Sequence, residues 1–136
     1  MPEKATIERA RKDKREGKSP STQAGEFVRE EIEHIREGKH GARSTEQAIA
    51  IGLSKARRAG VKLKPPRKGQ TSERTRKNAA RAYSAGQSAT RRKPSAKRAR
   101  ASLKKLRREP HRAASRKALS THARSVARRR RRQSSA

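Results

Sequence analysis

Large apolar side chains are scarce in this chain, and most of them lie in its first half. Only 14 of the 136 residues are Leu, Ile, Val or Phe, and ten of these 14 precede Pro65. A highly charged chain in which such residues fall below roughly one-fifth does not form a core along its whole length. We therefore expect a small folded module before Pro65 and a region without a core of its own after it.

The net charge changes at the same place. Residues 1–63 contain 15 Lys and Arg against 10 acidic residues, whereas residues 64–136 contain 26 against two. Between them lies Lys64-Pro65-Pro66, where two prolines remove backbone donors and disfavour a helix. The sequence thus predicts a charged N-terminal helix or arm over 1–20, a helical hairpin over 21–63 and a basic Ala/Ser/Lys/Arg-rich tail over 64–136.

The first helix of the hairpin is expected to have Ser21 as its N-cap and to end before Gly38. A helical repeat of about 100° per residue separates its side chains into an apolar face and an opposite stripe of glutamates. We interpret the stripe as a solvated face, with docking of the basic tail and a divalent-metal site as alternatives. The apolar face comprises Ala24, Phe27, Val28, Ile32 and Ile35, and the glutamate stripe comprises Glu26, Glu30, Glu33 and Glu37.

The second helix of the hairpin begins with a capping-box pattern, in which Gln47 follows Ser44 by three residues. Gly60 fits the position after the helix, and Val61 fits the apolar contact that often accompanies such an end. Gly52 falls on the apolar face and allows a close approach of the two helix backbones.

The hairpin is too small to be stable alone, because about eight large apolar side chains do not offset the entropy lost in ordering some 40 residues. We expect it to dimerise, to recruit other helices or to fold on a partner. The preceding segment, about 5–16, has Ile7 as its one large apolar residue and is expected to be a frayed, solvated helix.

The tail contains three stretches of good helix formers, about 71–85, 95–108 and 113–132, with Ser72 or Thr71 as the first cap and Gly86 as the first stop. Like charges three and four residues apart repel one another, so we expect these stretches to be largely unfolded in water and to gain helix on a polyanion. The expected fold is all-α: a small helical hairpin followed by a basic, partly disordered tail with helical segments.

One block of the sequence resembles a known family. The stretch that runs from Glu26-Phe-Val-Arg to Arg58-Ala-Gly60, followed by Thr71-Ser-Glu-Arg, is similar to a bacterial family of small basic proteins of unassigned function. Some members are labelled DNA-binding or plasmid-stabilisation proteins. The resemblance implies a bacterial or phage source and supplies no functional residues.

The tail carries the strongest functional signal, which is its clusters of Lys and Arg. Such clusters contact phosphates, release condensed counterions and give affinity that does not depend on sequence. The alternative is a tail that only keeps the chain soluble, but so much like charge is self-repulsive without a polyanion. The expected contacts are Arg91, Arg92, Lys93, Lys97, Arg98, Lys104, Lys105, Arg107, Arg108, Arg128, Arg129, Arg130, Arg131 and Arg132.

The hairpin offers four further candidates for phosphate contact. Lys39 and Arg43 flank the N-terminus of its second helix, where backbone donors favour an anion. Arg57 and Arg58 lie off the apolar face of that helix and extend the same basic track. An ordinary exposed loop and solvated side chains are the alternative interpretations.

The expected target is duplex DNA. Phe27 and Tyr83 are the sole aromatic residues, which disfavours modules that stack on single-stranded bases. No zinc-finger or basic-zipper pattern is present, so phosphate contact without base readout is expected. Structured RNA stays open as a second target.

Other classes of function find little support in the sequence. Asp13 is the one aspartate, and the four histidines show neither close metal-ligand spacing nor a nucleophile motif, so we expect no enzyme, no metal and no cofactor. The basic helices lack the Trp, Phe and Leu that insert into a bilayer. The N-terminus has no apolar segment of a signal peptide, which favours the cytoplasm and the nucleoid.

The sequence therefore predicts sequence-tolerant DNA binding of the nucleoid-associated or linker-histone-like type, with a possible homodimer through the hairpin. The alternative is an assembly or interaction protein of a ribonucleoprotein or phage particle, in which the hairpin is the docking module.

Overall fold

The structure is a computed structural model that describes residues 2–88 and 95–135, and all regular secondary structure in these residues is helical. The predicted all-α class is thereby confirmed. The helices in chain order are α1 (Lys4–Arg15), α2 (Pro20–Arg36), α3 (Thr45–Arg58), α4 (Glu73–Gln87), α5 (Ala96–Arg107), the 3₁₀ turn η1 (Arg112–Ala114) and α6 (Arg116–Ser135).

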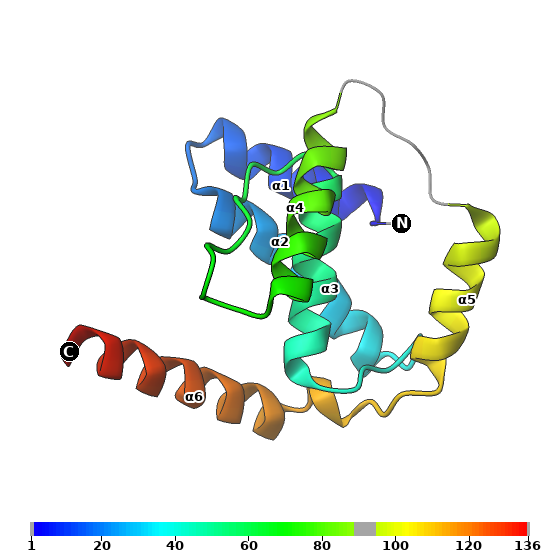
Figure 1. Ribbon diagram of the computed structural model, residues 1–136. Coiled ribbons are helices and arrows are strands. Elements are labelled where there is room, and N and C mark those ends of the chain that lie inside the picture. Colours follow the sequence, from blue (N-terminus) through cyan, green and yellow to red (C-terminus); the bar gives the residue numbers. More distant parts are fainter. Residues whose placement is uncertain (1, 89–94, 136) are drawn as a thin grey trace.

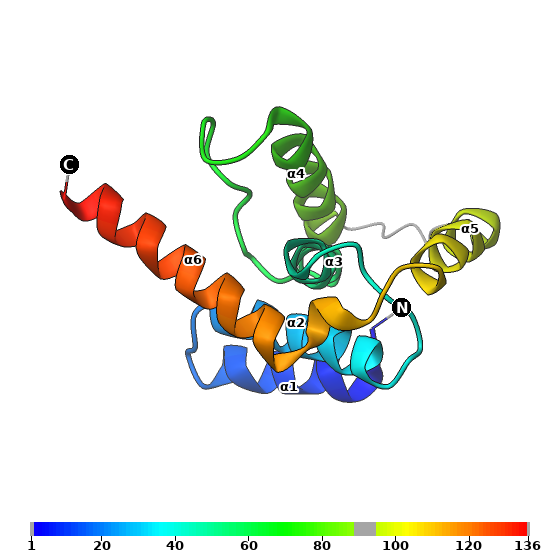
Figure 2. The same cartoon turned by 90° about the horizontal axis from the view of Figure 1, so that it is seen from below.

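Helices α1 to α4 stack side by side in chain order, with α2 and α3 in the middle (Figures 1 and 2). The predicted hairpin is the centre of this stack. Its helices cross closely at Gly52, where a Cβ atom would lie 2.6 Å from the Cα of Val28. The close approach predicted for Gly52 is confirmed. Helices α2 and α3 are antiparallel: the end of α2 packs with the start of α3 in one apolar cluster, and the start of α2 packs with the end of α3 in the other.

Side-chain caps define most helix starts, as the sequence predicts. The hydroxyl of Ser44 accepts a hydrogen bond from the backbone N–H of Gln47 at 3.1 Å. Ser72 caps α4 and Ser95 caps α5 in the same way. The prediction of Ser21 as the cap of α2 is wrong: Ser19 holds that role, because Pro20 fits the first helical position, where no backbone donor is needed.

Helix α1 is a packed element, and the expectation of a solvated helix is wrong. It buries Thr6, Ala10 and Asp13, and Ala10 joins an apolar cluster with Phe27 and Val61. Small side chains let α1 approach α2 closely, so a helix with few large apolar residues still has a buried face.

The glutamate stripe of α2 faces α1 for part of its length. Glu30 is 3% exposed and accepts a hydrogen bond from the backbone N–H of Glu3, and Glu26 pairs with Arg9 at 3.1 Å. The stripe is therefore neither a fully solvated face nor, among the described residues, a dock for the tail.

Helix α4 packs on α3 although it follows Pro65. It does so through the small residues Ala79, Ala82 and Gly86, which are buried. A Cβ at Gly86 would lie 1.7 Å from the carbonyl oxygen of Arg57, so only glycine fits the crossing. The sequence assigned Gly86 as a helix stop, but α4 continues to Gln87 and the glycine is there for packing.

The segment around η1 covers the rest of the hairpin's apolar face. Ala113 and Ala114 are buried against Ile32, Ile35 and Ala48. Thr45 donates to the Ala113 carbonyl at 2.6 Å, and backbone bonds from the α2–α3 loop reach Leu106 and Pro110. Of the three ways expected to stabilise the hairpin, the chain uses recruitment of its own helices.

The remaining parts of the tail lie at the periphery. Helix α5 has no buried residue, and α6 extends away from the stack after its first turns, on the side opposite α5 (Figures 1 and 2). The predicted helical segments of the tail are confirmed, whereas disorder in free solution and self-association stay predictions. No helix in the described part of the chain is both long and apolar enough to cross a bilayer.

Candidate nucleic-acid interface

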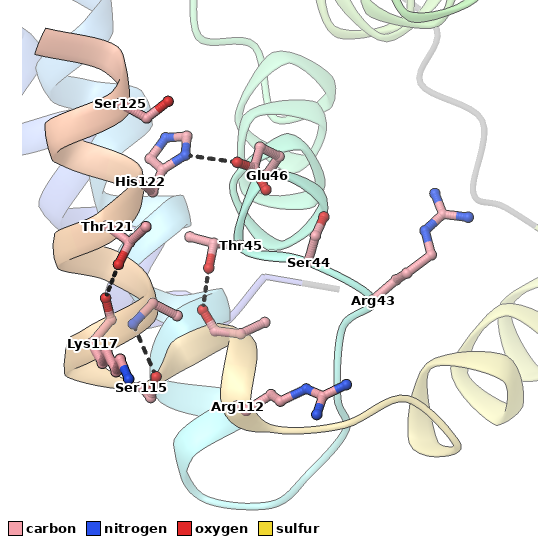
Figure 3. Close-up of a pocket in the computed structure, with 12 residues that line it drawn as sticks. Arg43, Ser44, Thr45, Glu46, Arg112, Ser115, Lys117, Thr121, His122 and Ser125 are labelled. Carbon is pink, nitrogen blue, oxygen red and sulfur yellow. Dashed lines mark hydrogen bonds and ion pairs between the residues drawn. The ribbon is translucent and has the colours of Figure 1, made fainter. Parts of the chain in front are cut away.

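A shallow groove of about 550 Å³ lies between the first turns of α3 and α6. Both first turns are held by serine caps, because Ser44 accepts from Gln47 N–H and Ser115 accepts from Ala118 N–H, each at 3.1 Å. The hydrogen bond from Thr45 to the Ala113 carbonyl joins the start of α3 to the segment before α6 at the bottom of the groove (Figure 3). Two helix N-termini, each with the positive end of its dipole, therefore open on one groove.

Cationic side chains line this groove at its margins. Arg43 comes from the loop before α3, Arg112 from η1 and Lys117 from α6, and none of the three pairs with a carboxylate among the residues described. In Figure 3 Arg43 and Arg112 extend away from the His122–Glu46 pair. The groove suits a phosphate group or a string of them, because two helix N-termini open on it and cations lie along its margins.

Glu46 is the one acidic residue in the groove lining, and it is held by His122. Its Oε1 lies 3.1 Å from Nδ1 of His122. Hydrogen bonds from its own backbone N–H and from His122 lower the pKa of Glu46 below its usual value. The carboxylate is thus tied to α6, which helps to fix α6 against α3.

The predicted contact residues of α5 all lie on its surface. The helix has no buried face, and its cations make no ion pair with a carboxylate in residues 2–88 or 95–135. The predicted contacts among these exposed cations are Lys97, Arg98, Lys104, Lys105, Arg107 and, at the helix end, Arg108.

The predicted contact residues of α6 lie in its outer half. Arg128, Arg129, Arg130, Arg131 and Arg132 are exposed. Five successive residues of a helix point in directions about 100° apart, so the arginines surround the helix and form no single face. Such an arrangement suits phosphate contact from more than one side.

The four candidates from the hairpin do not form one surface. Lys39 lies 3.4 Å from Glu37 and 3.7 Å from Glu3, and these carboxylates raise its pKa and partly neutralise it. Arg43 lines the groove and Arg58 is exposed on α3.

Arg57 has a structural position. It is 7% exposed, and its guanidinium donates to the carbonyls of Leu63 and Lys64 at 3.0 and 3.3 Å. Burial lowers the pKa of Arg57. Its hydrogen bonds fix the chain after α3, so it is turned away from any surface ligand.

The cluster Arg91, Arg92 and Lys93 lies outside the described residues. Sequence reasoning, in turn, missed Arg112 and Lys117. The sequence does contain a signal for them. Ser115 is a typical helix cap, and Arg112 and Lys117 lie three residues before and two residues after it, near a helix start.

Comparison with known proteins adds one finding. Residues 4–69, which comprise α1 to α3 and the Pro65-Pro66 segment, match the model of a family of unknown function, DUF6496. Neither a curated protein nor a solved structure matches the chain. The match includes the block from Glu26 to Gly60 and leaves Thr71 and helices α4 to α6 outside.

Proposed function

We propose that this chain binds duplex DNA with little sequence preference, through neutralisation of phosphates, in the manner of a nucleoid-associated or linker-histone-like protein. The observation that carries the proposal is the exposure of cations on two peripheral elements, α5 and the outer half of α6, which we call the basic arms. The cations of α5 pair with no carboxylate in residues 2–88 or 95–135, so they keep their attraction for phosphates.

The charge balance of the chain supports the arms as the contact region. In residues 2–63 most carboxylates pair with nearby cations, for example Glu26 with Arg9 and Glu33 with Arg29. In residues 64–136 there are 26 Lys and Arg and two acids. Part of this charge belongs to α4 and η1, but much of it lies in the basic arms, where it attracts a polyanion along its length.

Duplex DNA fits better than single strands, because the chain has no aromatic residue free to stack on a base. Phe27 is 1% exposed in the core, and Tyr83 is half-buried on α4. Proteins that bind single strands rely on exposed aromatic side chains for stacking. In a complex with duplex DNA, the phosphates of one strand would lie in the groove between α3 and α6, close to the body.

The test uses two variants of the full chain that lose the same charge in different places. In the first variant, each of the five arginines of the run Arg128–Arg132 is replaced by glutamine. The matched control changes five exposed cations of α1 to glutamine, namely Lys4, Arg11, Lys12, Lys14 and Arg15. Fluorescence anisotropy measures binding to two duplexes of unrelated sequence, a single strand and a folded RNA.

The proposal predicts that the arm variant loses at least about tenfold in affinity for both duplexes and that the α1 variant loses much less. Equal losses would show that total charge decides binding. Tighter binding to folded RNA, retained by the arm variant, would favour docking of the hairpin in a ribonucleoprotein or phage particle. A fluorescent fusion should colocalise with the nucleoid.

A further inference from the structure

A buried polar cluster lies at the end of α2, away from the groove. Glu31 and His34 are three residues apart on α2, and His40 follows in the loop after the turn at Gly38. Their candidate ligand atoms all lie within 4.8 Å of one another. Glu31 is 0% exposed and His40 is 5% exposed, so the cluster is part of the interior.

His40 is held in one orientation by the backbone. Its Nδ1 lies 2.9 Å from the carbonyl oxygen of Gly41, and because a carbonyl only accepts, Nδ1 carries the proton. The other ring nitrogen, Nε2, then faces Glu31 Oε2 at 3.2 Å. A histidine that donates its far N–H to a carbonyl is the usual arrangement of a metal ligand.

Lys55 holds the carboxylate of Glu31 so that it faces Nε2 of His40. The Lys55 ammonium holds Oε1 of the carboxylate, while Oε2 is buried and makes no hydrogen bond of acceptable geometry. A neutral His40 would turn a lone pair toward this unpartnered oxygen. The contact is favourable only when a cation, either a metal ion or a proton, lies between the two atoms.

We propose that Glu31, His34 and His40 bind a divalent transition-metal ion, with Zn²⁺ as the best fit. One carboxylate oxygen and two imidazoles are a donor set that zinc accepts. Ligand atoms about 2.0–2.1 Å from a tetrahedral zinc ion are roughly 3.3 Å apart, a value close to the 3.2 Å between Glu31 and His40.

The third ligand needs a small movement. His34 Nε2 now lies 3.1 Å from Glu3 Oε1, and a turn of its ring toward Glu31 brings it into the site. Glu3 can follow as a fourth ligand, since Glu3, Glu30 and His34 form an adjoining group of ligand atoms. Glu30 belongs to that group, and its Oε2 is buried without a hydrogen-bond partner.

The site ties together the parts of the fold that the tail docks on. His40 directly precedes Gly41 and Ala42, whose backbone N–H groups bind the carbonyls of Leu106 and Pro110. A metal ion that fixes His40 to α2 therefore fixes the loop that receives the tail. None of the proposed ligands belongs to the basic arms.

The test titrates the chelator-treated full chain with Zn²⁺ in competition with a chromophoric chelator, and records the absorption of the Co²⁺-loaded chain. We expect one equivalent of Zn²⁺ to bind, a rise in Tm on binding, and the intense visible bands of tetrahedral Co²⁺. His40→Gln and Glu31→Gln should weaken Zn²⁺ binding by well over 10-fold. The matched control, His122→Gln, removes another histidine that pairs with a glutamate, and should leave Zn²⁺ binding unchanged.

His34→Gln keeps the proposal testable if the buried variants do not fold, because His34 is less buried and should still weaken Zn²⁺ binding and abolish the Co²⁺ bands. Two results would overturn the proposal. One is Zn²⁺ binding that all variants share equally. The other is a metal-free chain whose His40 ¹⁵N signals show both ring nitrogens protonated and do not change with Zn²⁺, since a proton would then bridge His40 and Glu31.

Discussion

The packed body and the basic arms use their charges in opposite ways. In the body, which comprises α1 to α4 and η1, carboxylates and cations pair across helices, and Lys55 and Glu31 do so in the interior. In the arms the cations face solvent, and α5 buries nothing. The body pairs most of its carboxylates with nearby cations, whereas the arms carry cations almost without acids, and this difference is why we propose the arms as the DNA-binding part.

The division between body and arms does not follow the composition. Helix α4 and η1 belong to the basic half of the sequence, yet they pack on α3 and α2. They do so with alanine and glycine, which add little to the apolar content of a sequence but bring backbones close together. The body differs from the arms in that its segments bury small residues against one another.

The largest expected effect comes from a charge placed in the body. Ile35 is 0% exposed, so Ile35→Asp buries an unpaired carboxylate and should cost more than about 4 kcal/mol, enough to unfold the body. Leu103 on α5 is 36% exposed, and Leu103→Asp should leave the unfolding temperature unchanged. Thermal unfolding followed by circular dichroism compares the two. Equal destabilisation would remove the distinction between body and arm.

Glycine substitutions locate the edge of the body. Gly86→Ala places a methyl group against the Arg57 carbonyl and should destabilise the chain by about 1–3 kcal/mol. Gly25, inside α2, has open space at its Cβ, so Gly25→Ala should stabilise the chain by about 0.5–1 kcal/mol. Chemical denaturation gives both values. A neutral Gly86→Ala would mean that α4 is an arm.

The docking of η1 depends on few hydrogen bonds. Thr45→Val keeps the shape of the side chain but removes the donor to the Ala113 carbonyl, which should cost about 1–2 kcal/mol. The loss should be local: amide exchange should speed up around 113–122 and stay slow in α2 and α3. Unchanged exchange at 113–122 would show that apolar contacts alone hold the tail to the body.

The smallest effect concerns pH and the attachment of α6. The pKa of Glu46 is lower in the folded chain than its ordinary value of 4.5. Its ionised form therefore stabilises the folded state above that ordinary value, and the contribution is lost as the pH falls through the folded-state pKa. Glu46→Gln should flatten the fall of Tm below pH 4.5. An identical fall in both proteins would mean that neither the hydrogen bond from the backbone N–H of Glu46 nor the bond to His122 adds stability.

The sequence predicts the hairpin well because its signals are local. The cap at Ser44, the apolar face through Ile32 and Ile35, and the close approach at Gly52 each follow from spacing within one or two helices. The packing of α1 and η1 was missed, because Ala10, Ala113 and Ala114 look like ordinary helix formers in an Ala-rich sequence. Their burial depends on contacts between distant segments.

The candidate sites divide in the same way. The sequence is enough to predict the exposed cations of the basic arms, because an exposed side chain needs no contact with another segment. The inward position of Arg57 cannot be predicted in this way, since it depends on the carbonyls of Leu63 and Lys64. The cluster of Glu31, His40 and Lys55 was missed because its members come from a helix, a loop and a second helix, and only the fold brings them together.

The salt dependence of duplex binding by the full chain tests the central claim most directly. If the basic arms contact about ten phosphates, log K should fall linearly with log salt concentration with a slope near −9, equally for duplexes of unrelated sequence. A slope shallower than about −3, or a strong preference for one sequence, would contradict an account in which phosphate neutralisation by the arms supplies the affinity.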